Sequence, residues 1–323
     1  MHGVKQTILR DICIGCGACA YATEGRIPIV INDDGMYAAT ANGVADADFL
    51  RADAVCPFSD GALNEDQISE LVHDDEVSRH EFLGSYTKTY AGRVSSLEYL
   101  EGSSSGGITS WLLTQLMSRG LIDAVLNVGY SGPEEPLFSY EASADPSRTA
   151  ERKSRYYSTT LDEALGVVRE RPGRYAIVGV PCFIKATRLV AEQDPLVKER
   201  IVFHVGLVCG HMKSHFFGES MAWQLGIAPN ELANVDFRVK RAGRTSSDYD
   251  FGALRVGDQD WLYSPTRNLL GGSWGHGAFQ PEACNFCDDI FAETADVAFG
   301  DAWILSTGRT GAARTWLFLV APS

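Results

Sequence analysis

Eight cysteines occur in the sequence, and their spacing divides them into two sets of four. The N-terminal set contains Cys13, Cys16, Cys19 and Cys56, and the second set contains Cys182, Cys209, Cys284 and Cys287. A 4Fe-4S cluster takes one cysteine thiolate for each of its irons, so each set matches the ligand requirement of one cluster. Two such sets indicate a protein that transfers electrons.

The N-terminal set has the compact spacing of an iron–sulfur ligand loop. Cys13, Cys16 and Cys19 are separated by two residues each, a glycine lies in each gap, and Cys56 is followed by a proline. Glycine lets a loop curl closely around a cluster. Structural zinc is the competing interpretation, but it prefers two separated C-x2-C pairs. We therefore favour one 4Fe-4S cluster at these four cysteines.

The second set is spread along the chain, but two of its members follow predicted strands. Cys182 and Cys209 each come after a continuous apolar run, in the segments VGVPC and GLVCG, and Cys284 and Cys287 form a C-x2-C pair. The carboxyl ends of parallel strands meet at one edge of an α/β sheet, so the first two thiols should lie side by side there. The alternative is two buried structural cysteines and a small zinc or redox C-x2-C site. Spacing alone favours a second cluster but leaves that alternative open.

A Ser/Gly-rich loop, residues 102–107 (GSSSGG), leads into an amphipathic helix predicted over residues 108–119. The free N–H groups at a helix start, together with the hydroxyls, can bind an anion such as the diphosphate of a flavin nucleotide. The sequence contains no G-x-G-x-x-G, so a standard dinucleotide-binding fold is not predicted. An ordinary serine-capped helix start explains the loop equally well, and both interpretations stay open on these residues alone.

Two groups of basic residues stand out in an otherwise acidic chain. The first contains Arg148, Arg152, Lys153 and Arg155, and the second contains Arg238, Lys240, Arg241 and Arg244. Runs of charge are usually solvated faces, and we expect this of most of these residues. A protein that binds anionic cofactors nevertheless needs local positive charge, so the two groups are the candidates to supply it.

The elements that must position these residues alternate between strand and helix from about residue 83 onward. Apolar runs predict strands over residues 122–130, 175–180 and 201–208, and helical spacing predicts helices over residues 161–170, 183–192 and 212–225. Buried strands separated by helices of about ten residues indicate a mostly parallel sheet covered on both faces. The fold class is therefore α/β, or α+β for the chain as a whole. Residues 233–270 are richer in turns, which predicts an antiparallel insertion.

The chain divides into three segments by composition. Residues 1–62 form a compact segment that carries the first cysteine set, residues 63–82 a linker, and residues 83–323 the larger domain. Within and around the linker, residues 64–80 are acidic and have apolar residues at helical spacing, which predicts an exposed helix.

The bulk composition excludes several classes of function. The chain has 323 residues and a formal net charge of −14, which argues against nucleic-acid binding and against docking on an anionic membrane. No apolar run approaches the roughly 20 residues of a membrane-spanning helix, and the N-terminus lacks the pattern of a secretory signal. We therefore expect a cytoplasmic protein whose cysteines are thiolate ligands rather than disulfides.

Several segments, taken in order, resemble the family of coenzyme F420 hydrogenase/dehydrogenase beta subunits, whose relatives include 7-hydroxymethyl chlorophyll a reductase. The segments are SSSGGITSWLL, RYYST at 155–159, VGVPC, GLVCG, DFRVK at 236–240, CNFC and ADVAFGDAW. The resemblance covers nearly the whole chain, from about Cys13 to Trp303. One departure is the short C-terminus, because chains of this family normally continue further after the last of these segments.

The resemblance implies an FAD bound partly by the Ser/Gly loop, a 4Fe-4S cluster on the second cysteine set and, in some members, an additional ferredoxin-like module. On this basis residues 1–62 are the ferredoxin-like 4Fe-4S module and residues 83–323 the flavin and iron–sulfur domain. The resemblance identifies Ser104, Ser105, Gly106 and Gly107 as candidate flavin contacts, and Arg155, Tyr156, Arg238 and Lys240 as further candidates. For Asp301 and Trp303 a purely structural role is the alternative.

Together, the residues and the resemblance predict an oxidoreductase. It would pass electrons between a one-electron donor such as ferredoxin and a two-electron substrate such as coenzyme F420, through two 4Fe-4S clusters and FAD. A non-catalytic electron-transfer subunit of a larger redox complex is the first alternative, and a zinc-stabilised α/β protein is the second. The expected partners are ferredoxin or another redox subunit and a small-molecule hydride donor or acceptor, with a homo-oligomer left open. No residue is singled out as a general acid or base.

Overall fold

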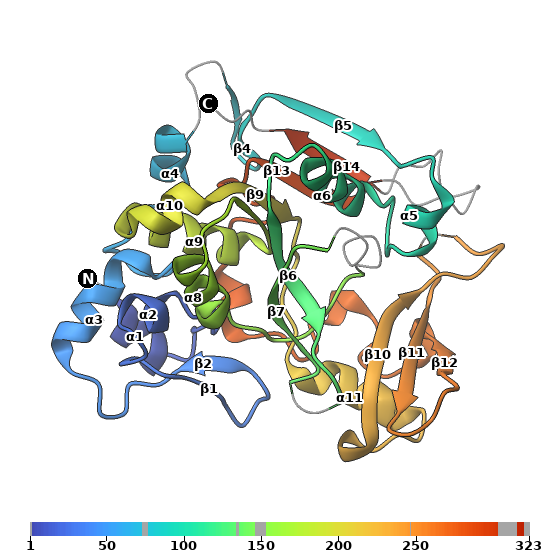
Figure 1. Cartoon of the computed structure of the whole chain (residues 1–323). Helices are drawn as coiled ribbons and strands as arrows, with labels where there is room; N and C mark the ends of the chain where they lie inside the picture. The colour runs from blue at the N-terminus through green and yellow to red at the C-terminus, as the bar shows by residue number, and fades with distance from the viewer. Residues whose placement is uncertain are drawn as a thin grey trace.

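The computed structural model of the chain describes residues 2–72, 77–133, 136–145, 153–245, 247–302 and 315–319. Its central feature is one large sheet, in which the described residues form seven strands (Figure 1). In spatial order these are β5 (Lys88–Gly92), β14 (Thr315–Leu319), β13 (Val297–Asp301), β9 (Ile201–Leu207), β8 (Tyr175–Gly179), β6 (Ala124–Tyr130) and β7 (Phe138–Ser143).

The centre of this sheet is parallel and its edges are antiparallel. Strands β6, β8, β9 and β13 pair in parallel, whereas β7 pairs antiparallel with β6, and β14 pairs antiparallel with both β13 and β5. The predicted parallel sheet is therefore correct for the strands that carry the second cysteine set. The sheet as a whole is mixed, because the edge strands β5, β7 and β14 join it through antiparallel pairing that no sequence pattern predicted.

Helices cover both faces of the sheet. Helices α8 (Asp162–Glu170), α9 (Pro181–Gln193) and α10 (Pro195–Arg200) lie on one face, and α6 (Ile108–Ser118) lies on the other (Figure 1). Alternate side chains of a strand point to opposite faces. Accordingly, Leu126 and Ile177 belong to the hydrophobic cluster that includes α8 and α9, while Val125 and Val178 pack with Leu113 of α6.

The predicted helices and strands of this domain are confirmed, with one shifted boundary. Residues 108–119, 122–130, 161–170, 175–180, 183–192 and 201–208 correspond to α6, β6, α8, β8, α9 and β9. The helix predicted over residues 212–225 begins later, as α11 (His215–Gln224). The residue before it, Ser214, has an extended backbone with a φ of −72° and a ψ of 169°, so the helical conformation begins only at His215.

The antiparallel insertion is also confirmed. Strands β10 (Leu232–Val239), β11 (Asp250–Arg255) and β12 (Leu262–Pro265) form a separate antiparallel sheet. It lies beside α11, at the side of the molecule away from the N-terminal segment (Figure 1). Phe217 of α11 packs against Phe237 and Phe251 in a second hydrophobic core. Short 3-10 turns lie at Pro229–Glu231, Thr266–Asn268, Trp274–His276 and Glu282–Phe286.

The N-terminal segment has its own small core and is joined to the main domain. It contains α1 (Val4–Leu9), α2 (Ala18–Ala22), β1 (Ile29–Ile31), β2 (Tyr37–Ala39), α3 (Asp46–Ala52) and the 3-10 turn Asp53–Val55. The Leu161 N–H donates to the Cys16 carbonyl at 3.0 Å, and the Tyr37 N–H donates to the Ser158 hydroxyl at 2.9 Å. Ile14 and Cys16 belong to the same hydrophobic cluster as the strands of the large sheet.

The acidic segment that follows is helical over α4 (Glu65–Val72), and its apolar side faces the main core. Ile68 is 1% exposed and lies in the hydrophobic cluster of α8 and α9. Glu65 also forms an ion pair of 2.8 Å with Lys185 of α9. Strands β3 (Ser78–His80) and β4 (Gly84–Tyr86) form a hairpin after it, and α5 (Leu97–Glu101) precedes the Ser/Gly loop. Among the described helices, none combines the length and apolar character needed to cross a bilayer.

Candidate cofactor sites

The four N-terminal cysteines line one pocket, here called the N-terminal pocket. Its wall contains Cys13, Cys16, Cys19 and Cys56 together with apolar side chains such as Val4, Ile8, Ile29 and Phe58. The N–H groups of Gly15 and Ala39 each lie 3.4 Å from the Cys13 sulfur and donate to it. Backbone donors of this kind stabilise a sulfur ligand that carries negative charge, so the pocket suits thiolates.

Two glycines shape the loop around this pocket. Gly15 and Gly17 have φ values of +64° and +84°, in the left-handed region that residues with a side chain rarely adopt. A β-carbon on Gly15 would lie 2.1 Å from the Tyr37 carbonyl oxygen, and one on Gly17 would lie 2.5 Å from the Thr160 hydroxyl. The predicted role of these glycines, which is to let the backbone curl between the cysteines, is confirmed by this geometry.

The second set of cysteines lines another pocket, here called the inner pocket. Cys182 is the second residue of α9, directly after β8, and Cys209 follows the end of β9. Strands β8 and β9 are parallel neighbours, so the ends of both strands lie at the same edge of the sheet. Cys284 and Cys287 reach the pocket from the 3-10 turn Glu282–Phe286 and the residue after it.

In both pockets, burial favours the neutral form of the thiols. Burial raises the pKa of all eight thiols. Repulsion between neighbouring thiolates adds to this effect, so that burial and the Cys284 charge raise the pKa of Cys209 to about 12. Metal ions supply the positive charge that keeps grouped thiols deprotonated.

Each pocket groups four thiols, a number that both a single zinc ion and a cubane can take. A cubane has a larger core and takes its four cysteines around the outside. The residues of both pockets therefore fit 4Fe-4S clusters.

The two pockets are neighbours. Ile14 and Phe58 line both of them. Moreover, the charge of Cys16, in the N-terminal set, contributes to raising the pKa of Cys182 in the inner set. This adjacency was not accessible from the sequence, in which the two cysteines are separated by more than half of the chain.

A loop of residues 210–214 wraps the inner pocket and contributes groups that no sequence pattern had indicated. The His211 ring lines the pocket and stacks on Trp274, with ring centroids 4.3 Å apart and an interplanar angle of 15°. The N–H of Met212 donates to the Cys284 sulfur at 3.3 Å. Lys213 is 1% exposed, and its ammonium donates to the Ala278 carbonyl. No motif marked these residues, because their roles depend on contacts with distant segments.

The Ser/Gly loop is held by contacts from two other segments. Gly107 has a φ of +75° and directly precedes α6. The Ser104 hydroxyl accepts a hydrogen bond from the Ser154 N–H at 2.9 Å. The Lys240 ammonium donates to the carbonyls of Leu100 and Ser105, each at 2.7 Å. Thus the loop, the segment before RYYST and the end of β10 lie together, as an anion site made from these segments requires.

Three cationic side chains gather beside this loop. Arg238 pairs with Asp301 at 2.7 Å, and Lys153 pairs with Asp236 at 2.5 Å. Loss of hydration and the charges of Arg238 and Lys153 lower the pKa of Lys240 to about 8. Although Lys240 is exposed as a residue, its ammonium lies against the loop. The three cations together exceed the two carboxylates, which leaves positive charge for an anionic ligand.

Arg238 supplies a further indication of a ligand. It is 6% exposed, and its Nε is a buried donor that has no hydrogen-bond partner among the described residues. A buried donor normally has an acceptor, since a buried group left without its hydrogen bond costs about 1–3 kcal/mol of stability. The residues around the loop therefore fit the diphosphate of a flavin nucleotide. Ser105, Gly106 and Gly107 supply backbone at the helix start, and Arg238 and Lys240 supply charge.

Tyr156 and Arg155, the two candidate residues of the RYYST segment, have different surroundings. The Tyr156 ring lies 4.5 Å from the Trp274 ring and 5.3 Å from the Phe237 ring, and burial raises the pKa of its hydroxyl. Since Trp274 also stacks on His211, Tyr156 connects the inner pocket with the surroundings of Arg238. The Arg155 guanidinium lies 4.8 Å from the centroid of the Phe138 ring.

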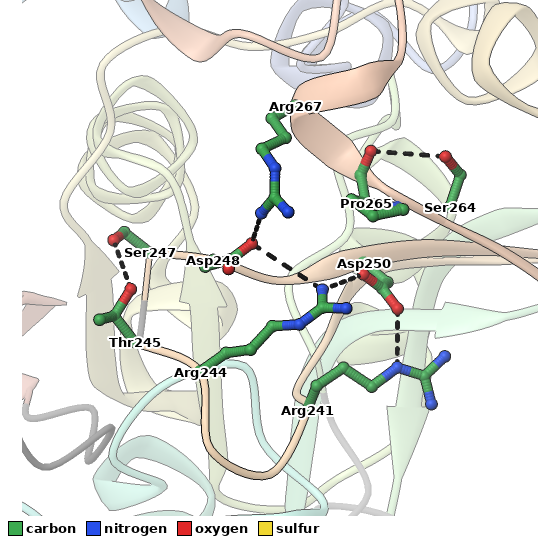
Figure 2. Close-up of polar contacts among 9 residues, drawn as sticks. All are labelled: Arg241, Arg244, Thr245, Ser247, Asp248, Asp250, Ser264, Pro265 and Arg267. Carbon is green, nitrogen blue, oxygen red and sulfur yellow. Dashed lines mark hydrogen bonds and ion pairs between the residues drawn. The ribbon is translucent and has the colours of Figure 1, made fainter.

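The remaining members of the two basic groups either pair with carboxylates or lie outside the described residues. Arg241 and Arg244 both pair with Asp250, at 2.7 Å and 2.6 Å, and Arg244 also approaches Asp248, which pairs in turn with Arg267 (Figure 2). These arginines are neutralised by carboxylates of the insertion, as expected for a solvated charged face. Arg148, Arg152 and Trp303 lie outside the described residues.

Known proteins resemble this chain in sequence and in fold. Residues 89–166 match the N-terminal model, and residues 173–322 the C-terminal model, of the coenzyme F420 hydrogenase/dehydrogenase beta subunit. The chain therefore belongs to the family of coenzyme F420 hydrogenase/dehydrogenase beta subunits, which are components of oxidoreductases. The resemblance inferred from the sequence motifs is confirmed.

Among individual proteins, the chain is similar to one subunit of the F(420)H(2) dehydrogenase of Methanosarcina mazei. The two are 30% identical over 218 residues, which cover 64% of this chain and 55% of the relative. The chain thus spans about half of the length of that relative. Its fold is similar to that of a chain in the F420-reducing nickel–iron hydrogenase complex from Methanosarcina barkeri, with a TM-score of 0.54 and 18% identity over 75% of this chain and 77% of the other.

Proposed function

We propose that this chain is a flavin- and iron–sulfur-dependent oxidoreductase that transfers electrons between a one-electron carrier such as ferredoxin and a two-electron substrate such as coenzyme F420. The observation that carries the proposal is the arrangement of all eight cysteines around two neighbouring pockets. Each pocket offers the four thiols that one 4Fe-4S cluster requires. When bound, the clusters exchange single electrons and FAD can exchange two, which joins one-electron to two-electron chemistry.

The side chains around each cofactor site have distinct tasks. Cys13, Cys16, Cys19 and Cys56 would hold the N-terminal cluster, and Cys182, Cys209, Cys284 and Cys287 the inner cluster. Ile14 and Phe58 line both pockets, so two apolar side chains are shared by the two proposed cluster sites.

Ser104, Ser105, Gly106 and Gly107 would contact the FAD diphosphate, and Lys240 fixes the loop through two carbonyls. Arg238, with its unpartnered Nε, would donate to the cofactor. Tyr156 packs on Trp274, which stacks on His211 of the inner pocket, and Arg155 remains a candidate contact beside Phe138.

Cofactor analysis of the anaerobically purified protein tests the proposal. We expect about eight irons, about eight acid-labile sulfides and about one FAD per chain, from the ligand count of the two pockets. Reduced ferredoxin should then support reduction of coenzyme F420 in the presence of the protein, followed by the change in F420 absorbance. A colourless protein with zinc, or one without flavin, would remove the enzymatic proposal.

A second candidate function is a non-catalytic electron-transfer component of a larger redox complex, to which another chain brings the substrate site. Two observations favour it: the relative from Methanosarcina mazei is one subunit of a dehydrogenase, and the structurally similar chain comes from a hydrogenase complex. Turnover of coenzyme F420 by the isolated chain would exclude this candidate. Full cofactor content without turnover would favour it.

A further inference from the structure

Lys213 carries a buried positive charge that no described carboxylate balances. The residue is 1% exposed, and its ammonium donates to the Ala278 carbonyl. The same ammonium lies 4.8 Å from the ring centroids of both Phe217 and Trp274. Among the described carboxylates, none forms an ion pair with it. One carbonyl and two aromatic rings solvate the ammonium without neutralising it.

A buried charge of this kind is costly unless an opposite charge lies nearby. Removing an ammonium from water costs several kcal/mol in proteins, and a carbonyl or a ring face recovers only part of this. Two other buried cations of the domain have such partners: Lys185 pairs with Glu65, and Arg238 pairs with Asp301. The exception at Lys213 indicates that its counter-ion is a bound anionic group.

The position of Lys213 identifies where that group lies. The residue belongs to the loop of residues 210–214, which wraps the inner pocket, and the preceding N–H, that of Met212, donates to the Cys284 sulfur. The Lys213 charge acts on Cys284 directly, since it opposes the burial that raises the pKa of this thiol. It also reaches His211, which lines the pocket. The ammonium is therefore close to the ligands of the inner pocket.

We propose that Lys213 is the counter-ion of the inner iron–sulfur cluster and raises its reduction potential. This inference rests on the proposed function, because it requires a cluster on Cys182, Cys209, Cys284 and Cys287. A cluster with four thiolate ligands is anionic, and reduction by one electron adds a further negative charge. A fixed cation in a dry environment stabilises the reduced form more than the oxidised form. Lys213 thus acts on the cluster through its charge and is not one of the ligands.

Two substitutions separate the charge of Lys213 from its packing. Lys213→Met retains an unbranched apolar chain that can still contact Phe217 and Trp274, but it removes the charge. Lys213→Arg retains the charge and changes the shape. Lys198→Met is the matched control, because Lys198 is 60% exposed and pairs with Glu192 at 2.7 Å, as an ordinary surface lysine.

The experiment is a redox titration of the anaerobically purified holoprotein, monitored by electron paramagnetic resonance. In Lys213→Met, one of the two cluster potentials should become more negative, so that the ratio of reduced to oxidised cluster at a fixed potential falls at least about tenfold. A tenfold change corresponds to about 59 mV for a one-electron couple. Both potentials should stay close to the unsubstituted values in Lys213→Arg and Lys198→Met.

The iron content tests the inference even if Lys213→Met is less stable than the unsubstituted protein. If Lys213→Met loses about half of its iron while Lys213→Arg keeps it, the charge is required for the cluster and the inference holds. If Lys213→Met keeps both clusters at unchanged potentials, or if Lys213→Arg behaves as Lys213→Met does, the inference is overturned. Failure of the proposed function is a different result, since the unsubstituted protein would then contain no cluster on the second cysteine set.

Discussion

Replacing Gly15 by alanine should remove the N-terminal cluster and leave the inner cluster in place. Gly15 has a φ of +64°, and an alanine β-carbon there would lie 2.1 Å from the Tyr37 carbonyl oxygen and 2.4 Å from the Tyr37 carbonyl carbon. Ordinary contacts begin near 3.4 Å, so the methyl group and the backbone of β2 must separate by about 1.3 Å. Both clashing atoms belong to backbone, which cannot rotate away as a side chain could.

The energetic cost follows from two contributions. The left-handed conformation costs an alanine roughly 1–2 kcal/mol, and forcing a methyl group into a packed site typically costs about 1–3 kcal/mol more. The displaced strand also carries Ala39, whose N–H donates to the Cys13 sulfur. Movement of β2 therefore disturbs the ligand loop itself.

Gly43 offers a matched control within the same segment. Its φ is +74°, and a β-carbon there would meet nothing within 4 Å. Gly43→Ala thus introduces the conformational cost of roughly 1–2 kcal/mol without the clash. We expect Gly43→Ala to keep the full iron content, with a lower unfolding temperature as its main effect.

The assay is iron analysis and electron paramagnetic resonance on anaerobically purified variants. Gly15→Ala should retain about four irons per chain, compared with about eight in the unsubstituted protein and in Gly43→Ala. Full iron content and an unchanged spectrum in Gly15→Ala would refute the role given to the Tyr37 contact. Loss of all iron would show instead that the two clusters do not assemble independently.

Three further predictions address the other sites. Cys287→Ser should reduce the iron content to about four per chain, because it removes one inner ligand; about eight irons by chemical analysis would contradict that assignment. Lys240→Met should weaken FAD binding about tenfold or more, since two charge-assisted hydrogen bonds are lost, one to Ser105 in the Ser/Gly loop and one to Leu100 in α5. The control Arg241→Met, whose guanidinium is engaged by a carboxylate, should bind FAD normally when both affinities are measured by flavin fluorescence titration. For His204, burial and the Arg188 charge lower the pKa to about 4 from the usual 6.5. The unfolded state therefore binds the proton more readily, and this group should destabilise the protein by about 2 kcal/mol as the pH falls from 8 to 5. His204→Leu should show a correspondingly smaller fall in denaturation midpoint over that range, and an identical fall would disprove the role of His204.

Local patterns in the sequence predicted the elements that carry the inner cysteines. Continuous apolar runs identified β6, β8 and β9, because a strand buried on both faces has no polar alternation. The position of Cys182 and Cys209 after two such strands was enough to predict that they meet, since parallel neighbours end at the same edge of a sheet. The edge strands β5, β7 and β14 escaped prediction, because antiparallel pairing at a sheet edge depends on distant partners.

The contacts of the basic residues could not be predicted from composition. Arg238, Lys240, Arg241 and Arg244 are nearly consecutive, and nothing in their order distinguishes them. The structure directs Lys240 to the Ser/Gly loop and Arg238 to Asp301, whereas Arg241 turns to Asp250. Successive side chains leave the chain in different directions, so the identity of the nearest carboxylate is a tertiary property.

By itself, the sequence determined how many thiols each site contains, which strands and turns carry them, and where glycine must stand between them. Those properties depend on residue type and on short separations along the chain. The tertiary structure alone decided that the two pockets share Ile14 and Phe58. It also decided that Lys213, next to the Met212 N–H that donates to Cys284, is buried without a described carboxylate to pair with. Such contacts join segments that are far apart in sequence, and the folding of the whole chain is what brings them together.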